Sequence, residues 1–184
     1  KMSYCYLCGH PTARKSSPDH NFWQCTASGQ TYFNNPKPAA EIILIDETGR
    51  VAVAKRARDP YKGMLDLPGG FIDAGETLEE GIVREIHEEI GLTSDQYSHL
   101  VYLASATADY PWGQELTDVV TAAFTAQIDS SVALVASDDV ASIELVDISQ
   151  FKREDFAWPT QYDRVEQAIA HWQAKAPVSI SDNR

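Results

Sequence analysis

Three glutamates near the middle of the chain have the spacing of a metal-binding cluster. Glu85, Glu88 and Glu89 lie at positions i, i+3 and i+4, so their side chains project side by side if the segment is a helix. Like charges at these spacings destabilise a helix by about 0.2–0.5 kcal/mol per pair. A divalent cation between the carboxylates would offset this repulsion. Carboxylate ligands favour Mg²⁺ or Mn²⁺, and Mg²⁺ commonly takes further ligands from water and substrate phosphates, so the cluster indicates phosphate chemistry.

An alternative interpretation is that the glutamates form a solvated helix face, partly neutralised by Arg84. The flanking residues favour a site, because they complete the pattern G-x5-E-x7-R-E-U-x-E-E-x-G-U, where U is aliphatic. The pattern runs from Gly70 to Leu92. Its chance occurrence in a chain of average composition is on the order of 10⁻⁸.

The segment from Gly70 to Leu92 resembles the signature of the Nudix hydrolases, and residues 67–70, Leu-Pro-Gly-Gly, are similar to the usual lead-in. The resemblance implies that Glu76 and Arg84 brace the loop and the helix of the signature. It also implies that Mg²⁺ or Mn²⁺ is bound by the three glutamates and the carbonyl of Gly70. These metal-binding positions are Gly70, Glu85, Glu88 and Glu89.

The activity that the resemblance implies is hydrolysis of the pyrophosphate linkage in a nucleoside diphosphate linked to another moiety. We expect ADP-ribose-like or nucleotide-sugar substrates to be preferred. Members of the family differ in their general base, so Glu88 or Glu89 competes with a later glutamate, of which Glu115 and Glu144 are candidates. Glu115 either moves over the metal ions or is an ordinary exposed loop acid. The expected catalytic residues are Glu88, Glu89, Arg84 and Glu115.

Three residues outside the signature are candidates for substrate binding. Arg56 precedes the glycine loop and either neutralises phosphates or serves solubility. Tyr110 and Trp112 flank a proline in a predicted loop, where they either stack on a nucleobase or pack against the sheet. Leu65 stands where many relatives have a tryptophan, so base stacking is not expected at that position.

The elements that must position these residues indicate an α+β fold. A capping box at Thr77 and Glu80 starts one helix, which Gly91 ends, and a second amphipathic helix is predicted from 160 to about 174. Strands are predicted at 41–45, 51–54, 99–107, 116–128 and 143–146. This order suits the Nudix fold, a mixed β-sheet sandwiched between α-helices. The prolines of residues 34–38 predict an extended connection before it, rather than a central strand.

The three cysteines lie before this connection and resemble part of a zinc ribbon. Cys5, Cys8 and Cys25 match three positions of a C-x2-C…C-x2-C site, and Ser28 stands at the fourth. The segment either binds Zn²⁺ or is a metal-free remnant packed by aromatic residues. In both cases we expect a small β element that covers the main domain or forms a homodimer interface. The expected domains are a zinc-ribbon-like segment at 1–37, a Nudix hydrolase domain at 38–176 and a flexible tail at 177–184.

The charge balance narrows the classes of partner. The 184 residues carry a formal net charge of −12, which opposes loose binding to nucleic acid or anionic lipid. No apolar run approaches the ~18 residues of a membrane span, and the start lacks the apolar run of a secretory signal. We therefore expect a cytoplasmic enzyme that binds a small nucleoside-diphosphate derivative. A non-catalytic module that senses such a compound is the alternative, and the three intact glutamates favour catalysis.

Overall fold

The computed structural model describes residues 3–18, 20–113 and 115–175. The chain forms two compact units, Lys1–Pro36 and Lys37–Arg184. The tail predicted at 177–184 lies outside the described residues.

The N-terminal unit contains a small antiparallel sheet, which confirms the predicted β element. Its strands are β1 (Thr12–Ser16), β2 (Asn21–Cys25) and β3 (Thr31–Phe33), in the order β1-β2-β3. A small core of Cys5, Cys25 and Tyr32 holds the unit together, and Trp23 packs against it.

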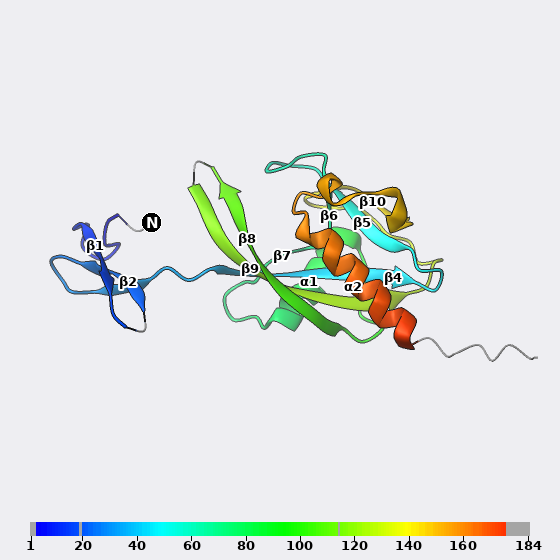
Figure 1. The fold of residues 1–184 in the computed structure, drawn as a ribbon, viewed down its shortest axis with the longest axis horizontal. Helices are drawn as coiled ribbons and strands as arrows, with labels where there is room; N and C mark the ends of the chain where they lie inside the picture. The colour runs from blue at the N-terminus through cyan, green and yellow to red at the C-terminus, as the bar shows by residue number, and fades with distance from the viewer. Residues whose placement is uncertain (1–2, 19, 114, 176–184) are drawn as a thin grey trace, which may run out of the picture. The chain divides into compact units, whose positions relative to one another are not determined.

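The second unit is built on a seven-stranded mixed sheet in the order β10-β5-β4-β9-β8, where β6 pairs with β5 and β7 pairs with β4 (Figure 1). β4 and β9 are parallel, and the remaining strand pairs are antiparallel. The strands are β4 (Lys37–Asp46), β5 (Val51–Arg56), β6 (Leu65–Asp66), β7 (Gly69–Phe71), β8 (Val101–Trp112), β9 (Glu115–Ile128) and β10 (Val140–Val146).

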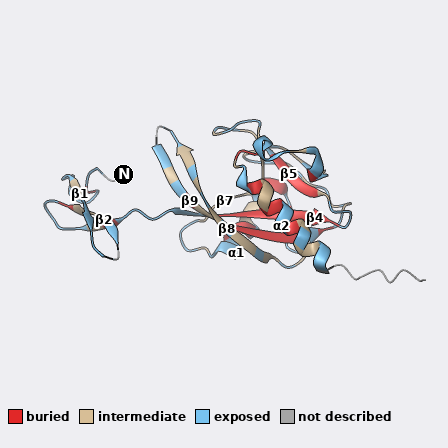
Figure 2. Cartoon of the chain, viewed as in Figure 1, coloured by how far each residue is buried: buried red, intermediate tan, exposed pale blue. Residues whose placement is uncertain are grey.

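The two helices α1 (Leu78–Ile90) and α2 (Thr160–Lys175) cover opposite faces of this sheet (Figure 1). Successive side chains of β4 point to opposite faces of the sheet. Ile42 and Leu44 belong to the apolar cluster that includes residues of α1, whereas Ile43 and Ile45 belong to the one that includes residues of α2. A strand covered on both faces is apolar almost throughout. Figure 2 accordingly shows β4 and β5 as mostly buried. The predicted fold class, a mixed sheet between helices, is confirmed.

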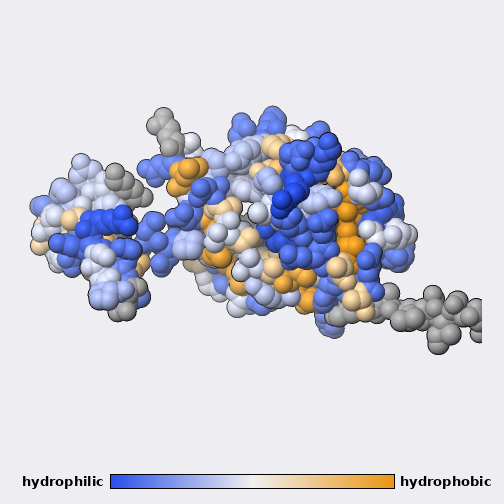
Figure 3. Space-filling model, in the orientation of Figure 1, coloured by the Kyte–Doolittle hydropathy of each residue, from blue (hydrophilic) through white to orange (hydrophobic). Residues whose placement is uncertain are grey.

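Two short 3₁₀ helices, η1 (Ile148–Gln150) and η2 (Arg153–Asp155), connect β10 to α2. None of the described helices is long and apolar enough to cross a membrane. The surface over α2 is largely hydrophilic in the view of Figure 3, as expected for the outer face of an amphipathic helix.

Two segments differ from their predicted conformation. Lys37 and Pro38 were expected in a connection, but they begin β4 and pair with Val119 and Val120 of β9. The predicted loop around Tyr110 is instead the end of a long β8–β9 hairpin. Proline is tolerated there because β8 is the edge strand of the sheet.

Candidate functional site

Helix α1 presents its three signature glutamates at different depths: Glu89 is buried beside the apolar stripe, Glu85 is half-buried and Glu88 is exposed. Thr77 accepts a hydrogen bond from the Glu80 amide, and the Glu80 carboxylate accepts one from the Thr77 amide, which completes the predicted capping box. Ile82, Ile86 and Ile90 are fully buried against the sheet. This packing fixes the rotation of the helix. Glu85 and Glu89 therefore lie against the glycine loop at β7, at Gly70 and Gly69 respectively.

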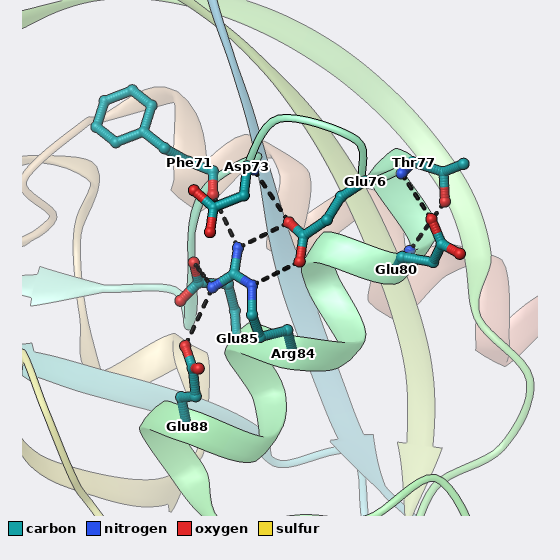
Figure 4. Close-up of polar contacts among 8 residues, drawn as sticks. All are labelled: Phe71, Asp73, Glu76, Thr77, Glu80, Arg84, Glu85 and Glu88. Atoms are coloured by element: carbon teal, nitrogen blue, oxygen red, sulfur yellow. Dashed lines mark hydrogen bonds and ion pairs between the residues drawn. The ribbon is translucent and has the colours of Figure 1, made fainter.

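Arg84 joins the glycine loop to this acidic face (Figure 4). Its Nε and Nη2 donate to Glu76 Oε1 and Oε2 at 2.8 and 3.0 Å, and Nη2 also donates to the Phe71 carbonyl at 3.1 Å. Nη1 donates to Glu85 Oε1 at 2.7 Å and to Glu88 Oε2 at 3.1 Å. The ion pair with Glu76 is the largest of the contacts that raise the pKa of Arg84. Arg84 is therefore a fixed cation at the edge of the acidic patch.

Gly70 provides the space that the Glu85 carboxylate occupies. A Cβ at position 70 would lie 2.5 Å from Glu85 Oε1 and 2.7 Å from its Cδ, so a larger residue cannot coexist with this side-chain position. Burial raises the pKa of Glu85, and the Arg84 guanidinium partly opposes that effect. Gly70 and Glu85 are thus in contact, as two ligands of one metal ion would need to be.

Glu89 is the most buried of the three glutamates, at 8% exposed. Its Oε2 accepts a hydrogen bond from the Gly69 amide at 2.8 Å. Burial raises its pKa to about 8, and the nearby carboxylates of Glu85, Asp66 and Asp139 act in the same direction. Those three carboxylates are each paired with an arginine, whereas Glu89 has no salt bridge among the described residues. Glu88 differs from it, because its side chain is 49% exposed.

The donor set suits a hard cation, although the side chains are not gathered around one position. The only group of three or more His, Cys, Asp or Glu ligand atoms within 4.8 Å of one another, among the described residues, is formed by cysteines. The Glu85 and Glu88 carboxylates turn toward Arg84, whereas Glu89 turns toward Gly69. The carboxylate oxygens of these glutamates are nevertheless the ligand type that Mg²⁺ and Mn²⁺ prefer.

A cavity of about 160 Å³ adjoins this acidic patch. Glu89 and Gly70 lie in its wall together with the aromatic side chains of Phe71, Tyr110 and Trp158. Tyr110 and Trp158 are stacked, with centroids 5.7 Å apart and an interplanar angle of 16°. The cavity thus combines an acidic end with flat apolar surfaces, which is the composition typical of a small-molecule site.

Arg56 lies in the same wall, but its guanidinium has partners within the protein. Nη1 donates to Asp66 Oδ2 at 2.5 Å, and Nε donates to the Pro60 carbonyl at 2.7 Å. Its Cζ also lies 5.1 Å from the centroid of the Trp158 ring, a cation–π distance. In this structure the Arg56 guanidinium therefore lies over the Trp158 ring and is already bonded within the protein.

A buried polar network closes the α2 side of the cavity. Arg164 is paired with Glu41 of β4, with Nη2 at 3.0 Å from Oε2, and both residues are more than nine-tenths buried. Gln161 Nε2 donates to Asp66 Oδ1 at 2.6 Å. Burial raises the pKa values of Glu41 and Asp66, and the hydrogen bonds and charges of these partners partly oppose that increase. The Gln161 Oε1 atom is buried and has no hydrogen-bond partner among the described residues.

Only some of the predicted substrate-binding and general-base residues lie in the cavity wall. Arg56 and Tyr110 line the cavity. Among the described residues that form its wall, Trp112, Glu115 and Glu144 are absent. Trp112 is 63% exposed and packs against Phe71 and Tyr110. Glu115 pairs with Trp112 at the end of the hairpin, and Glu144 lies in β10. The wall residues that the sequence did not predict include Glu41, Asp66, Trp158 and Gln161. Of these only Glu41 had a signal, a charge inside an apolar strand.

The three cysteines of the N-terminal unit converge. Their Sγ atoms all lie within 4.8 Å of one another, and all three cysteines are free thiols. Tyr32 Oη lies 2.9 Å from Cys5 Sγ, and the Ser28 amide donates to Cys25 Sγ at 3.4 Å. Hydrogen bonds from Ser28 lower the pKa of Cys25 to about 6.

A family model of the NUDIX domain matches residues 35–167. Over 113 residues the chain is 34% identical to an ADP-ribose pyrophosphatase of Methanocaldococcus jannaschii, covering 61% of this chain and 63% of that protein. It is 30% identical over 129 residues to the NAD-capped RNA hydrolase NudC of Escherichia coli O157:H7, covering 69% of this chain and 44% of that protein. The chain thus spans less than two thirds of either relative.

Among solved structures, a NUDIX hydrolase from Nitrosomonas europaea superimposes with a TM-score of 0.70 at 22% identity. The superposition covers 96% of this chain and 95% of that one. At this identity the likeness concerns the fold.

Proposed function

Because the chain belongs to the NUDIX-domain family, we propose that it hydrolyses the pyrophosphate linkage of a nucleoside diphosphate joined to another moiety. One observation carries the proposal. The cavity that contains Glu89 and Gly70 in its wall also contains Tyr110 and Trp158. A diphosphate at the acidic end would therefore be continuous with a nucleoside against the aromatic side chains.

The proposed metal site consists of Glu85, Glu88, Glu89 and the carbonyl of Gly70. Bound Mg²⁺ or Mn²⁺ would supply charge neutralisation of the diphosphate oxygens and activation of the attacking water. The protein's own part is to hold the carboxylates near the cavity. Arg84, anchored by Glu76, fixes the approach of the helix to the loop, and the Gly69 amide orients Glu89.

We place the general base within the acidic helix, at Glu88 or Glu89. Glu89 lies in the cavity wall, and Glu88 is one residue away and half-exposed. Glu115 is a weaker candidate, because it lies at the exposed end of the β8–β9 hairpin. A base must reach the attacking water to within about 2.6–3.2 Å, directly or through one water.

ADP-ribose-like compounds are our preferred substrate class. The named activity of the archaeal relative supports this preference. In the cavity, Trp158 and Tyr110 offer flat surfaces to a base, and the unpaired Gln161 Oε1 offers an acceptor to a polar hydrogen. We also propose that residues 38–176 form the catalytic domain and that Cys5, Cys8 and Cys25 of the N-terminal unit bind Zn²⁺.

The test is a panel of nucleoside-diphosphate derivatives followed by phosphorus NMR, with and without a chelator. We expect two phosphate-bearing products from at least one compound, only when Mg²⁺ or Mn²⁺ is present. Glu88→Gln and Glu89→Gln should each lower kcat strongly while folding is retained. Glu79→Gln is the matched control, because Glu79 is an exposed residue in the first turn of the same helix. Tight binding without turnover across the panel would instead support the sensing module.

A further inference from the structure

Two turns of the N-terminal unit have nearly the same backbone. The Gly9 amide donates to the Cys5 carbonyl at 2.8 Å, and the Gly29 amide donates to the Cys25 carbonyl at 3.1 Å. Both glycines have left-handed backbone, with φ of 71° and 73°, which glycine adopts without steric cost. The segments 5–9 and 25–29 are therefore equivalent turns of the form C-x-x-C-G and C-x-x-S-G.

The first three sulfur positions of this pair of turns suit one zinc ion. Cys8 Sγ and Cys25 Sγ are 3.5 Å apart, and all three sulfurs lie within 4.8 Å of one another. Zinc–thiolate bonds of about 2.3 Å in a tetrahedron place sulfurs about 3.8 Å apart. A disulfide would require about 2.05 Å, so the observed spacing is that of a metal site rather than a crosslink.

The equivalence of the turns places Ser28 where a fourth sulfur would be. A neutral hydroxyl is not among the ligands that zinc sites ordinarily use, which are thiolate, imidazole and carboxylate. Ser28 Oγ also accepts a hydrogen bond from the Gln30 amide at 3.4 Å. No other His, Cys, Asp or Glu of residues 3–18, 20–113 and 115–175 joins the group. His10, the nearest in sequence, has its Nδ1 3.2 Å from the Cys8 carbonyl.

We infer that the N-terminal unit binds one Zn²⁺ through three thiolates and leaves the fourth coordination position, beside Ser28, to an exchangeable ligand from solution. This inference rests on the zinc proposal above. Structural zinc sites are closed by four protein ligands, whereas an open position admits water or another small ligand. Because Cys8 and Ser28 are both exposed, that position faces solvent. Small thiols and imidazoles are the ligand class that such a position would accept.

The experiment loads the full chain with Co²⁺ in place of Zn²⁺ and compares wild type with Ser28→Ala and Ser28→Cys. We expect wild type and Ser28→Ala to have the same spectrum and affinity, with thiolate-to-metal absorption from three sulfurs. Imidazole in excess should shift both spectra. Ser28→Cys should show absorption in the ratio of four sulfurs to three, resist imidazole, and bind Zn²⁺ at least about 10-fold more tightly in chelator competition.

Two results would overturn the inference, and they are distinguishable. A loss of affinity in Ser28→Ala, together with a wild-type spectrum that imidazole does not change, would show that the serine hydroxyl is the fourth ligand. Absence of stoichiometric Zn²⁺ or Co²⁺ in the wild-type chain would reject the zinc proposal itself. Neither readout involves hydrolysis, so both results leave the proposed activity of the second unit unaffected. Circular dichroism of each variant checks that the unit has folded.

Discussion

Replacing Gly70 by alanine should damage the proposed metal site while sparing the fold. The added Cβ would lie 2.5 Å from Glu85 Oε1, a distance at which one of the two groups must move. The group that gives way is the end of a flexible carboxylate side chain, so the cost to folding is small, roughly within 1 kcal/mol. The carboxylate cannot then remain beside position 70, where we propose that it binds the metal ion.

The adjacent substitution, Gly69→Ala, provides the contrast. Its Cβ would lie 2.2 Å from the Ala40 carbonyl oxygen and 2.7 Å from the Glu41 Cα, both backbone atoms of the central strand β4. Gly69 also has a φ of 145°, which L-residues rarely adopt. Backbone strain and overpacking each cost about 1–3 kcal/mol. Gly69→Ala should therefore lower the free energy of unfolding by several times more than Gly70→Ala.

The assays are urea unfolding for both variants and Mg²⁺ titrations of turnover for Gly70→Ala. We expect Gly70→Ala to require more Mg²⁺ and to lose about 10–100-fold in activity, the size of effect seen when metal ligands are misplaced by a neighbour. If Gly70→Ala keeps both its Mg²⁺ requirement and its kcat within about twofold, Glu85 does not bind the metal from this position. If Gly70→Ala unfolds as readily as Gly69→Ala, then the added Cβ does not displace the Glu85 carboxylate and the backbone moves instead.

Three further outcomes follow from ion-paired, stacked and hydrogen-bonded side chains. Arg164→Met leaves the Glu41 carboxylate buried without its partner, and it should lower the free energy of unfolding by about 3–5 kcal/mol in urea titrations. Trp158→Ala removes the stacking surface and should raise KM while kcat changes little; an unchanged KM would mean that the ligand does not contact this ring. Burial alone would raise the pKa of Asp46, but hydrogen bonds from Thr48 and its neighbours outweigh it, so the pKa is lowered. Asp46→Asn should therefore cost about 1–3 kcal/mol of stability at pH 7, and this difference should shrink as the pH falls through the carboxyl range, since only the ionised form is stabilised.

The acidic helix could be predicted from sequence because its determinants are local. The capping box at Thr77, the four-residue apolar period and the glycine at position 91 all act within one helix length. The strand conformation at the end of the β8–β9 hairpin was harder to predict, because the sequence Tyr-Pro-Trp-Gly also suits a loop. Only the register with β9, in which Tyr110 pairs with Thr117, makes these residues a strand, and that register depends on the whole sheet.

The cavity could not be predicted, since its wall is assembled from distant parts of the chain. Asp66 comes from β6, Tyr110 from β8, and Trp158 precedes α2. No spacing relates these positions, and their contacts arise only when α2 packs on its face of the sheet. Glu41 gave a local hint, because a carboxylate within a buried strand needs a partner, but the sequence did not identify Arg164 as that partner.

The pairing of the arginines bears directly on how a diphosphate could be held. The two cations in the cavity wall, among the described residues, are Arg56 and Arg164. Each already neutralises a buried carboxylate, Asp66 and Glu41 respectively. Releasing either one to a phosphate would leave that carboxylate buried and unpaired, at a cost of several kcal/mol. The charge of a bound diphosphate must therefore be balanced from outside the protein, and an enzyme of this construction should bind its substrate tightly only together with divalent ions. Measuring binding of a slowly hydrolysed analogue with and without Mg²⁺ tests this, and equal affinity in both conditions would contradict it.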